Sequence, residues 1–270
     1  QAGAQAGNYF GGYLLTSRLN ADTCDDLAVG AAYVENSKGS VFIYFGSSSA
    51  FGSSSLQIRD TGSVLQANNS TDLGSEFGWW ITTGDLNSDT FPDLVVGARR
   101  HNQPGRINNG AVFVLYGPFT ANSAVSLTSG TQIYGARGLS QPPPQNTMMG
   151  GPAGDELGWS LFVANLNNDT HDDLLIGAVQ ADRVFARLGP FVAGSIDLNS
   201  PASYLFSLDG PSVGDPAVQR ASVGMSLSVA DLSGDGTPDI VVGAPFGGPA
   251  YPFSFQGMQM QVNSGGVYIV

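Results

Sequence analysis

The sequence is poor in positive charge, cysteine and histidine. Its 270 residues contain ten Lys and Arg residues, among which Lys38 is the single lysine, together with two His and one Cys. A lone Cys excludes an internal disulfide. Ten cations against 22 acidic residues give a net charge of −12, which argues against nucleic-acid binding, because phosphate recognition needs clustered cations.

Long apolar runs are also missing. No stretch of about 18 apolar residues occurs, so we expect no membrane span. The opening QAGAQAGNYF lacks the basic and apolar regions of a signal peptide, as the mature form of a secreted chain would. What is abundant is glycine (37) and proline (15), alongside Val, Phe, Tyr and Ser. Since Gly and Pro form turns and the aromatic and β-branched residues favour strands, we predict an all-β fold.

One pattern occurs four times. The copies are RLNADTCDDLAVGAA (18–32), DLNSDTFPDLVVGAR (85–99), NLNNDTHDDLLIGAV (165–179) and DLSGDGTPDIVVGAP (231–245). Each is preceded by an apolar residue and a glycine, as in FGGYLL, FGWWIT, LGWSLF and VGMSLS. Gly-led alternating runs follow copies one, two and four, and DRVFARLG stands at this place in copy three. Four short strand-like segments per repeat are typical of a β-propeller blade.

The repeats set the predicted organisation. We expect one β-propeller domain over residues 1–270, with repeats at about 10–76, 77–156, 157–222 and 223–270. The last repeat ends at GGVYIV, before a fourth strand, so it is incomplete. A segment of a longer chain, a small ring closed by strand exchange, and completion by neighbouring copies all remain open.

The acidic half of each copy forms a nine-residue loop: loop one (18–26), loop two (85–93), loop three (165–173) and loop four (231–239). Oxygen-bearing side chains at positions 1, 3, 5 and 9, with the carbonyl of position 7, suit Ca²⁺, which takes six to eight oxygen ligands. An EF-hand would need Glu at position 12, where Val96, Ile176 and Val242 stand. A turn without metal is the alternative. We interpret the apolar half of each copy as the inner strand of its blade.

The predicted ligands follow from this spacing. They are Asp85, Asn87, Asp89, Phe91 and Asp93 in loop two; Asn165, Asn167, Asp169, His171 and Asp173 in loop three; and Asp231, Ser233, Asp235, Thr237 and Asp239 in loop four. Loop three carries less charge, so weaker binding is expected there. Loop one offers Asn20, Asp22 and Asp26, but Arg18 stands at position 1. Its guanidinium could pair with those carboxylates and replace the ion, so we expect this loop to be weak or empty.

The pattern FG, D-x-N-x-D-x-x-x-D-L-x-V-G-A-P and G-x-V-Y resembles the FG-GAP repeat of integrin alpha-subunit β-propellers, also found in the propeller of glycosylphosphatidylinositol-specific phospholipase D. The resemblance covers Phe10 to Val270, and copy four matches it best. It implies calcium in the loops of one face and ligand recognition on the opposite face or at a partner domain. Such propellers usually have seven blades, whereas four repeats are present here.

No catalytic motif is found, and we predict that the chain is not an enzyme. His101 and His171 are expected at the surface, and Cys24 as an incidental half-buried thiol. Trp79, Trp80 and Trp159 suit packing between blades, with a sugar-stacking platform as the alternative. The basic segment ARRHNQPGR (98–106) could contact an anionic partner or glycan.

Glycosylation acceptor triplets at Asn68, Asn69 and Asn168 favour an extracellular location. The leading hypothesis is a calcium-binding propeller for adhesion, surface structure or assembly, with a protein partner or self-assembly into an oligomer or filament. The alternatives are a carbohydrate-binding propeller and an accessory domain of an enzyme.

Overall fold

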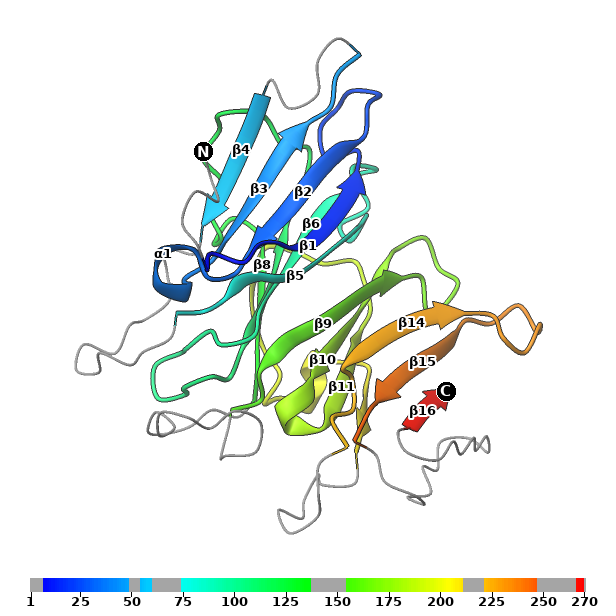
Figure 1. The fold of residues 1–270 in the computed structure, drawn as a ribbon. Coiled ribbons are helices and arrows are strands. Elements are labelled where there is room, and N and C mark those ends of the chain that lie inside the picture. Colours follow the sequence, from blue (N-terminus) through cyan, green and yellow to red (C-terminus); the bar gives the residue numbers. More distant parts are fainter. Residues whose placement is uncertain are drawn as a thin grey trace.

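The computed structural model describes residues 7–48, 54–59, 74–136, 154–210, 221–246 and 266–269. These residues form an all-β fold in which four sheets follow one another along the chain (Figure 1). Helical structure is confined to short turns in the described parts: α1 (Val34–Ser37), η1 (Val179–Ala181) and η2 (Pro201–Ser203). The four sheets correspond to the four repeats, which confirms the all-β, blade-like architecture predicted from the sequence.

Each sheet is an antiparallel meander that begins with the strand of the FG-type segment. Sheet one consists of β1 (Phe10–Ser17), β2 (Asp26–Ala31), β3 (Ser40–Phe45) and β4 (Ser54–Arg59). Sheet two consists of β5 (Phe77–Gly84), β6 (Asp93–Ala98), β7 (Ala111–Leu115) and β8 (Thr131–Tyr134), followed by β12 (Gly194–Asp197). Sheet three consists of β9 (Leu157–Ala164), β10 (Asp173–Ala178), β11 (Arg183–Arg187) and β13 (Phe206–Asp209). Sheet four consists of β14 (Ser226–Ala230), β15 (Asp239–Ala244) and β16 (Gly266–Ile269).

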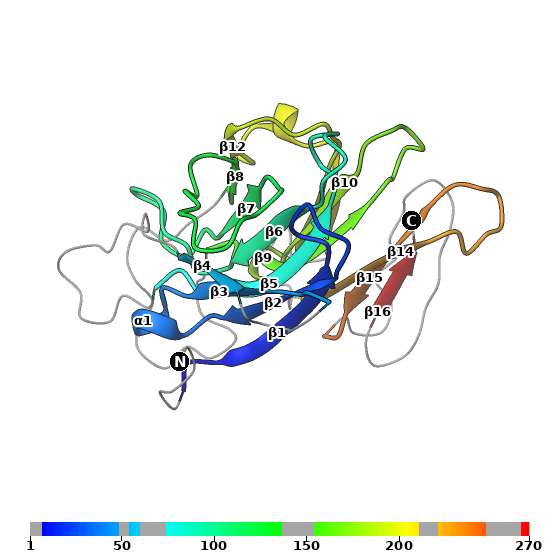
Figure 2. The same cartoon turned by 90° about the horizontal axis from the view of Figure 1, so that it is seen from above.

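The first strands of the sheets lie innermost. Strands β1, β5, β9 and β14 contact one another in succession, and Figure 2 shows the sheets fanning out from them. The apolar half of each sequence copy forms the second strand of its sheet and not the inner strand, so that interpretation was wrong. Strands β6 and β10 are buried along their whole length. A strand that has a hydrogen-bonded neighbour on each side and a packed sheet on each face is buried throughout, so its sequence is a continuous run of apolar residues.

The core is divided between neighbouring sheets. One cluster joins sheets one and two, a second joins sheets two and three, and a third joins sheets three and four. Sheet two gains an extra edge strand, because β12 from the third repeat pairs in parallel with β8. Local sequence gives no signal for this exchange, since β12 is only four residues long and its partner lies one repeat away.

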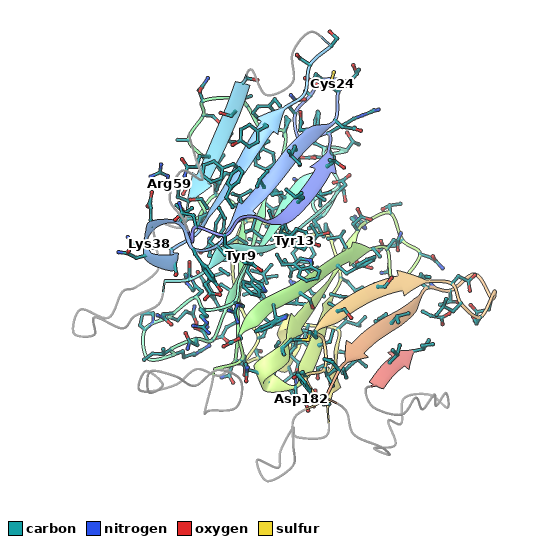
Figure 3. All side chains as sticks on the ribbon, viewed as in Figure 1. Tyr9, Tyr13, Cys24, Lys38, Arg59 and Asp182 are labelled. Carbon is teal, nitrogen blue, oxygen red and sulfur yellow. The ribbon has the colours of Figure 1, made fainter. Side chains whose placement is uncertain are left out.

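Repeat three differs from repeats one and two at a position where neighbouring sheets are in close contact. Gly39 and Gly110 stand two residues before Val41 and Val112, and a Cβ at either glycine would lie 2.1–2.2 Å from the backbone of Phe77 or Leu157 in the next sheet. Repeat three has Asp182 at this place, labelled in Figure 3. Asp182 keeps a positive φ of 59°, and its Oδ1 accepts a hydrogen bond from the backbone N–H of Val223 at 3.0 Å. A side-chain contact thus replaces a backbone contact between sheets.

Candidate metal-binding loops

The four acidic loops join the first and second strands of their sheets, and loops of neighbouring sheets touch. The backbone N–H of Asp85 in loop two donates to Asp172 Oδ2 in loop three at 2.9 Å. The side chain of Asn168 in loop three donates to the carbonyl of Gly236 in loop four at 3.2 Å. The predicted ligand-bearing loops therefore adjoin one another at one end of the row of sheets.

The aspartate at position 9 has the same structural role in every loop. One carboxylate oxygen accepts the backbone N–H of position 2, at 2.7–3.0 Å, in Asp26, Asp93, Asp173 and Asp239. In the first three loops the other oxygen accepts the N–H of a glycine that follows the third strand: Gly46, Gly117 and Gly189. Asp26, Asp93 and Asp173 are buried. In loops one to three this residue therefore ties the loop to the end of the third strand of its sheet.

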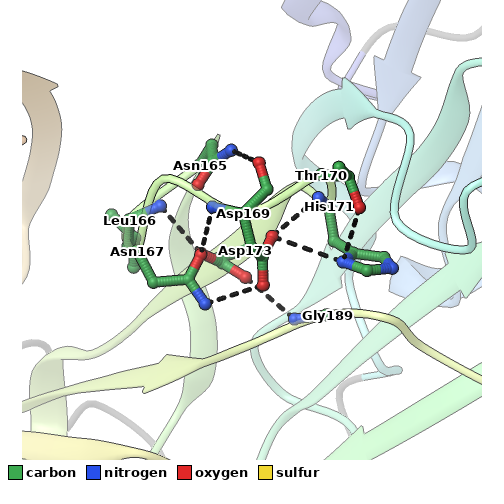
Figure 4. A network of polar contacts seen from close by, with 8 residues as sticks. All are labelled: Asn165, Leu166, Asn167, Asp169, Thr170, His171, Asp173 and Gly189. Carbon is green, nitrogen blue, oxygen red and sulfur yellow. Dashed lines mark hydrogen bonds and ion pairs between the residues drawn. The ribbon is translucent and has the colours of Figure 1, made fainter.

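Positions 3 and 5 form a chain of side-chain turns. In loop three, Asn167 Oδ1 accepts the N–H of Asp169 at 3.1 Å, and Asp169 Oδ1 accepts the N–H of His171 at 2.7 Å (Figure 4). Loops one and two repeat both contacts, and loop four repeats the second. These bonds fold the loop without an ion, because Asn and Asp side chains bond the backbone two residues ahead.

Position 1 differs between the loops. Asp85 accepts the N–H groups of Asp89 and Thr90, and Asp231 likewise accepts N–H groups of its own loop. Asn165 donates its Nδ2 to the carbonyl of Asp169, but its Oδ1 is buried and has no hydrogen-bond partner. Buried acceptors are normally satisfied. An acceptor without a donor is what a bound cation would complete.

The carboxylates of one loop have opposite pKa shifts. Burial raises the pKa of Asp93 to about 7, against the lowering effect of its bonds from Gly117 and Leu86, and the charges of Asp89 and Asp85 raise it further. Burial likewise raises the pKa of Asp173. The exposed position-5 residue behaves differently, because the backbone N–H of His171 lowers the pKa of Asp169. A buried carboxylate that faces two further carboxylates favours an added positive charge.

Loop one departs from the expected ion pair. Arg18 Nε lies 3.5 Å from Asp25 Oδ1, and both side chains are largely exposed. Arg18 therefore pairs with Asp25 at position 8, whereas Asn20 Nδ2 bonds Asp22 and Asp26 is engaged by backbone N–H groups. The expectation that Arg18 would reach the loop's ligand positions was wrong, although the cation still replaces an acceptor at position 1.

Loop conformation also separates the copies. Gly234 and Gly236 in loop four have positive φ values of 76° and 83°, and Ser88 and Thr90 in loop two match them at 67° and 74°. Threonine rarely adopts this conformation, because its branched Cβ clashes with the backbone at positive φ. Loop two therefore adopts the glycine form of the turn despite Thr90, which makes loops two and four the most similar pair.

The described residues do not hold a ready-made metal cluster. Among them, no group of three or more His, Cys, Asp and Glu side chains is gathered closely enough to hold a metal ion. The loops fit a hard cation in the chemistry of their donors, in the unpaired Asn165 oxygen and in the uncompensated charge around Asp93. Most of these oxygens accept hydrogen bonds from the loops' own N–H groups.

The sequence analysis missed a buried charged cluster at the other end of the first strands. Arg99 pairs with Glu76 at 2.6 Å and with Glu156 at 3.1 Å, and its guanidinium carbon lies 3.8 Å from the ring centroid of Trp79 and 4.5 Å from that of Trp159. The signal was present: Glu precedes the FG-type segment in repeats two and three, and Arg follows the second strand of repeat two. Only the fold shows that these residues meet.

This cluster corrects one expectation and supports another. Arg99 is buried, Arg100 pairs with Glu76, and Arg106 pairs with Asp197, so the basic segment 98–106 is neutralised within the chain. Trp79 and Trp159 face Arg99, which supports packing between sheets and leaves the sugar-platform alternative without an observation in its favour.

Other single residues can now be placed. His101 is buried against Phe113 and Tyr134, so its predicted surface position was wrong; its segment folds back onto the sheet. Cys24 is half-buried at the tip of loop one, as predicted (Figure 3). Asn168 is exposed in loop three. The acceptors Asn68 and Asn69 lie outside the described residues.

Within the described part of the chain, no helix has the length and apolar character needed to cross a membrane. Residues 77–115 and 223–270 match the model of the FG-GAP repeat family. Phosphatidylinositol-glycan-specific phospholipase D of Bos taurus is 29% identical over 64% of this chain and 19% of that protein. Integrin alpha-5 of Xenopus laevis is 28% identical over 77% of this chain and 18% of that protein, and integrin alpha-3 of Cricetulus griseus is 28% identical over 86% and 20%.

The chain thus spans about a fifth of the length of these curated relatives. The family match falls on repeats two and four, and the structure gives all four repeats the same order of strands and the same loop between the first two. The chain therefore contains FG-GAP repeats, and it is similar in sequence to integrin alpha subunits and to phosphatidylinositol-glycan-specific phospholipase D.

Proposed function

We propose that this chain is a non-enzymatic, extracellular β-propeller that binds calcium and serves adhesion, surface structure or protein assembly. Its relatives include integrin alpha subunits, and its acidic loops repeat one set of oxygen donors in phase with the sheets. A protein partner or further copies of the chain are the expected ligands, with a glycan as the alternative.

The observation that carries the calcium proposal is the charge of loop two. Asp93 is fully buried, and Asp85 and Asp89 both add negative charge to its surroundings. A turn held by hydrogen bonds alone could use uncharged acceptors at these positions, whereas three neighbouring carboxylates oppose one another's ionisation. A divalent cation would offset two of the three charges and would allow Asp93 to ionise.

The ligands would come from positions 1, 3, 5 and 9 and from the carbonyl of position 7. Calcium bound there would join these positions of the loop by coordinating their oxygen atoms. The backbone N–H groups that bind the position-9 aspartate would hold that ligand in place. Loop three lacks a carboxylate at position 1, yet the free Asn165 oxygen supplies a neutral ligand. Loop one has Arg18 at that position and is proposed to stay weak or empty.

Thermal melts with calcium and with a chelator test this proposal. Asp85→Ala and Asp231→Ala each remove acceptors of loop N–H groups as well as a proposed ligand, so the readout is the calcium-dependent gain in Tm and not Tm itself. One site filled at a hundred times its Kd adds about 2.7 kcal/mol. Asp25→Ala, which removes an exposed carboxylate outside the ligand positions, is the matched control. An unchanged Tm after chelation in the wild type would refute calcium binding.

An accessory role beside a catalytic domain is the second candidate, because one relative is named as a phospholipase D and this chain covers 19% of it. Neither candidate predicts hydrolysis by the isolated chain. Hydrolytic activity that stays with the purified 270-residue chain through successive columns would overturn both.

A further inference from the structure

Loop three differs from loops two and four at position 8. Loops two and four carry Pro92 and Pro238 there, whereas loop three carries Asp172. Proline has neither a backbone N–H nor a side-chain acceptor, and the bond between positions 2 and 9 forms beside it in both loops. Loop one has Asp25 at this place, and that residue pairs with Arg18 of its own loop. A loop of this type therefore folds without an aspartate at position 8.

Asp172 contacts position 1 of the neighbouring loop two through two hydrogen bonds. Its Oδ2 accepts the backbone N–H of Asp85 at 2.9 Å, and its own N–H donates to the carbonyl oxygen of Asp85 at 3.3 Å. The two bonds hold the peptide groups on both sides of Asp85, which is the proposed position-1 ligand of loop two. A residue of loop three thus fixes the backbone of a ligand in loop two.

The residue before loop two makes room for this contact. A Cβ on Gly84 would lie 2.7 Å from Asp172 Oδ2 and 2.3 Å from Val163 Cγ1. Loops three and four are preceded by alanine at the same place, Ala164 and Ala230. Repeat two therefore has a glycine at the point where the aspartate of repeat three approaches, so the two departures from the repeat pattern complement each other.

The contact joins proposed ligands of the two loops through two peptide groups. The N–H of Asp172 belongs to the same peptide group as the carbonyl of His171, the position-7 ligand of loop three. The carbonyl of Asp85 belongs to the same peptide group as the N–H of Leu86, which donates to Asp93 Oδ2 at 3.0 Å. Polarisation of the first peptide group at its carbonyl strengthens each later bond of such a chain. Position 7 of loop three is thereby connected to positions 1 and 9 of loop two.

This connection distinguishes loops two and three from the other neighbouring loops in the described part of the chain. Proline at position 8 of loops two and four can form neither of the two bonds that Asp172 makes. A more general link is shared: the N–H of Phe119 donates to the carbonyl of Leu19 in loop one at 2.8 Å, and the N–H of Phe191 donates to that of Leu86 in loop two at 2.7 Å. Asp172 adds a specific contact to this general one.

We propose that Asp172 is a positioning residue for loop two, and that loops two and three bind calcium as a coupled pair. This role rests on the calcium binding proposed above. Asp172 lies in the chain between His171 and Asp173, two proposed ligands of loop three (Figure 4), so occupation of loop three orders Asp172. The ordered Asp172 holds position 1 of loop two in place, and by linkage each filled loop raises the affinity of the other. Its carboxylate also opposes the repulsion between two bound cations.

A calcium titration of the isotope-labelled chain, followed by NMR, tests this role one loop at a time. The backbone amides of Thr90, His171 and Gly236 report on loops two, three and four, because each donates to a carboxylate of its own loop. Asp172→Pro gives loop three the residue of loops two and four and removes both bonds to Asp85. It is expected to raise the half-saturating calcium concentration at Thr90 about fivefold or more and to leave that at Gly236 unchanged.

Two variants separate positioning from folding. Asp172→Asn keeps an oxygen acceptor and the backbone N–H, so it is expected to restore most of the affinity at Thr90. Asp25→Pro makes the matched substitution at position 8 of loop one and is expected to leave Thr90 unchanged. In chelator, hydrogen exchange of the Asp85 amide is expected to accelerate in Asp172→Pro and to stay near the wild-type rate in the other two variants.

A further substitution tests the coupling itself. Asp85→Ala disables loop two but keeps the backbone groups that bond Asp172. It is expected to raise the half-saturating calcium concentration at His171 about fivefold in the wild-type background and to have no such effect in the Asp172→Pro background. Equal shifts in the two backgrounds would refute coupling through Asp172.

The outcomes separate this role from calcium binding as such. If Thr90 responds to the same calcium concentration in the wild type and in Asp172→Pro, while calcium still shifts Gly236, the positioning role is wrong and the calcium proposal stands. Equal exchange rates of the Asp85 amide in the two proteins would overturn the positioning role without reference to calcium. A wild type in which calcium shifts none of the three amides would overturn both proposals.

Discussion

Replacing Gly97 by alanine tests how the sheets hold together. The added Cβ would lie 2.2 Å from the Gly158 carbonyl oxygen and 3.2 Å from its carbon. The obstacle is backbone, so no rotamer change can relieve it, and sheets two and three would have to move apart by about 1 Å to restore a normal contact. Overpacked cores lose about 1–3 kcal/mol, and we expect the upper end of that range here.

A loss of about 3 kcal/mol corresponds to a fall in Tm of about 6–12 °C for a chain of this size. Calorimetry or circular dichroism would measure it. Gly243→Ala is the matched control, because its Cβ would meet only a side chain that can rotate. This substitution should change the free energy of unfolding by less than about 0.5 kcal/mol. Equal effects of the two substitutions would refute the argument that backbone contact between sheets sets the requirement for glycine.

Three further outcomes are expected. The pKa of Asp93 in the folded chain is about 7, whereas an unfolded aspartate has a pKa of about 3.9. The folded chain therefore retains this proton, and the calcium-free protein should lose up to about 4 kcal/mol of stability as pH rises from about 4 to about 7. Thermal melts across this pH range should show a smaller loss of stability when calcium is bound. Arg99→Ala would leave Glu76 and Glu156 buried without their cation and should destabilise the chain by about 3–5 kcal/mol in urea unfolding. A change below about 1 kcal/mol would contradict the cluster's role. Asp26→Ala should lower Tm through its lost backbone bonds and leave the calcium-dependent gain in Tm unchanged.

The repeats made most of the fold predictable. Period-2 runs and glycine turns place the strands correctly, because each sheet is a local meander whose hydrogen bonds join neighbouring segments. The parallel pairing of β12 with β8 was not predictable, since it joins segments from different repeats. The burial of His101 escaped for another reason: a polar turn gives no sign of the aromatic rings it will pack against.

The place of the acidic loops in the sheets was predictable, but their contacts were not. Spacing alone identified the four loops, which the structure places between the first and second strands of their sheets. It did not show that the position-9 aspartate is buried and held by two backbone N–H groups, as Asp93 is by Leu86 and Gly117. That role depends on a glycine some 24 residues further on, a contact that only the folded sheet creates. Nor did the sequence show that Arg18 would turn to Asp25.

Calcium titration of the 270-residue chain by isothermal calorimetry tests the central claim most directly. The proposal predicts one ion for each of loops two, three and four, loss of a single ion in Asp231→Ala, and full binding in Asp25→Ala. A titration without binding heat, together with equilibrium dialysis that finds no bound calcium, would contradict it.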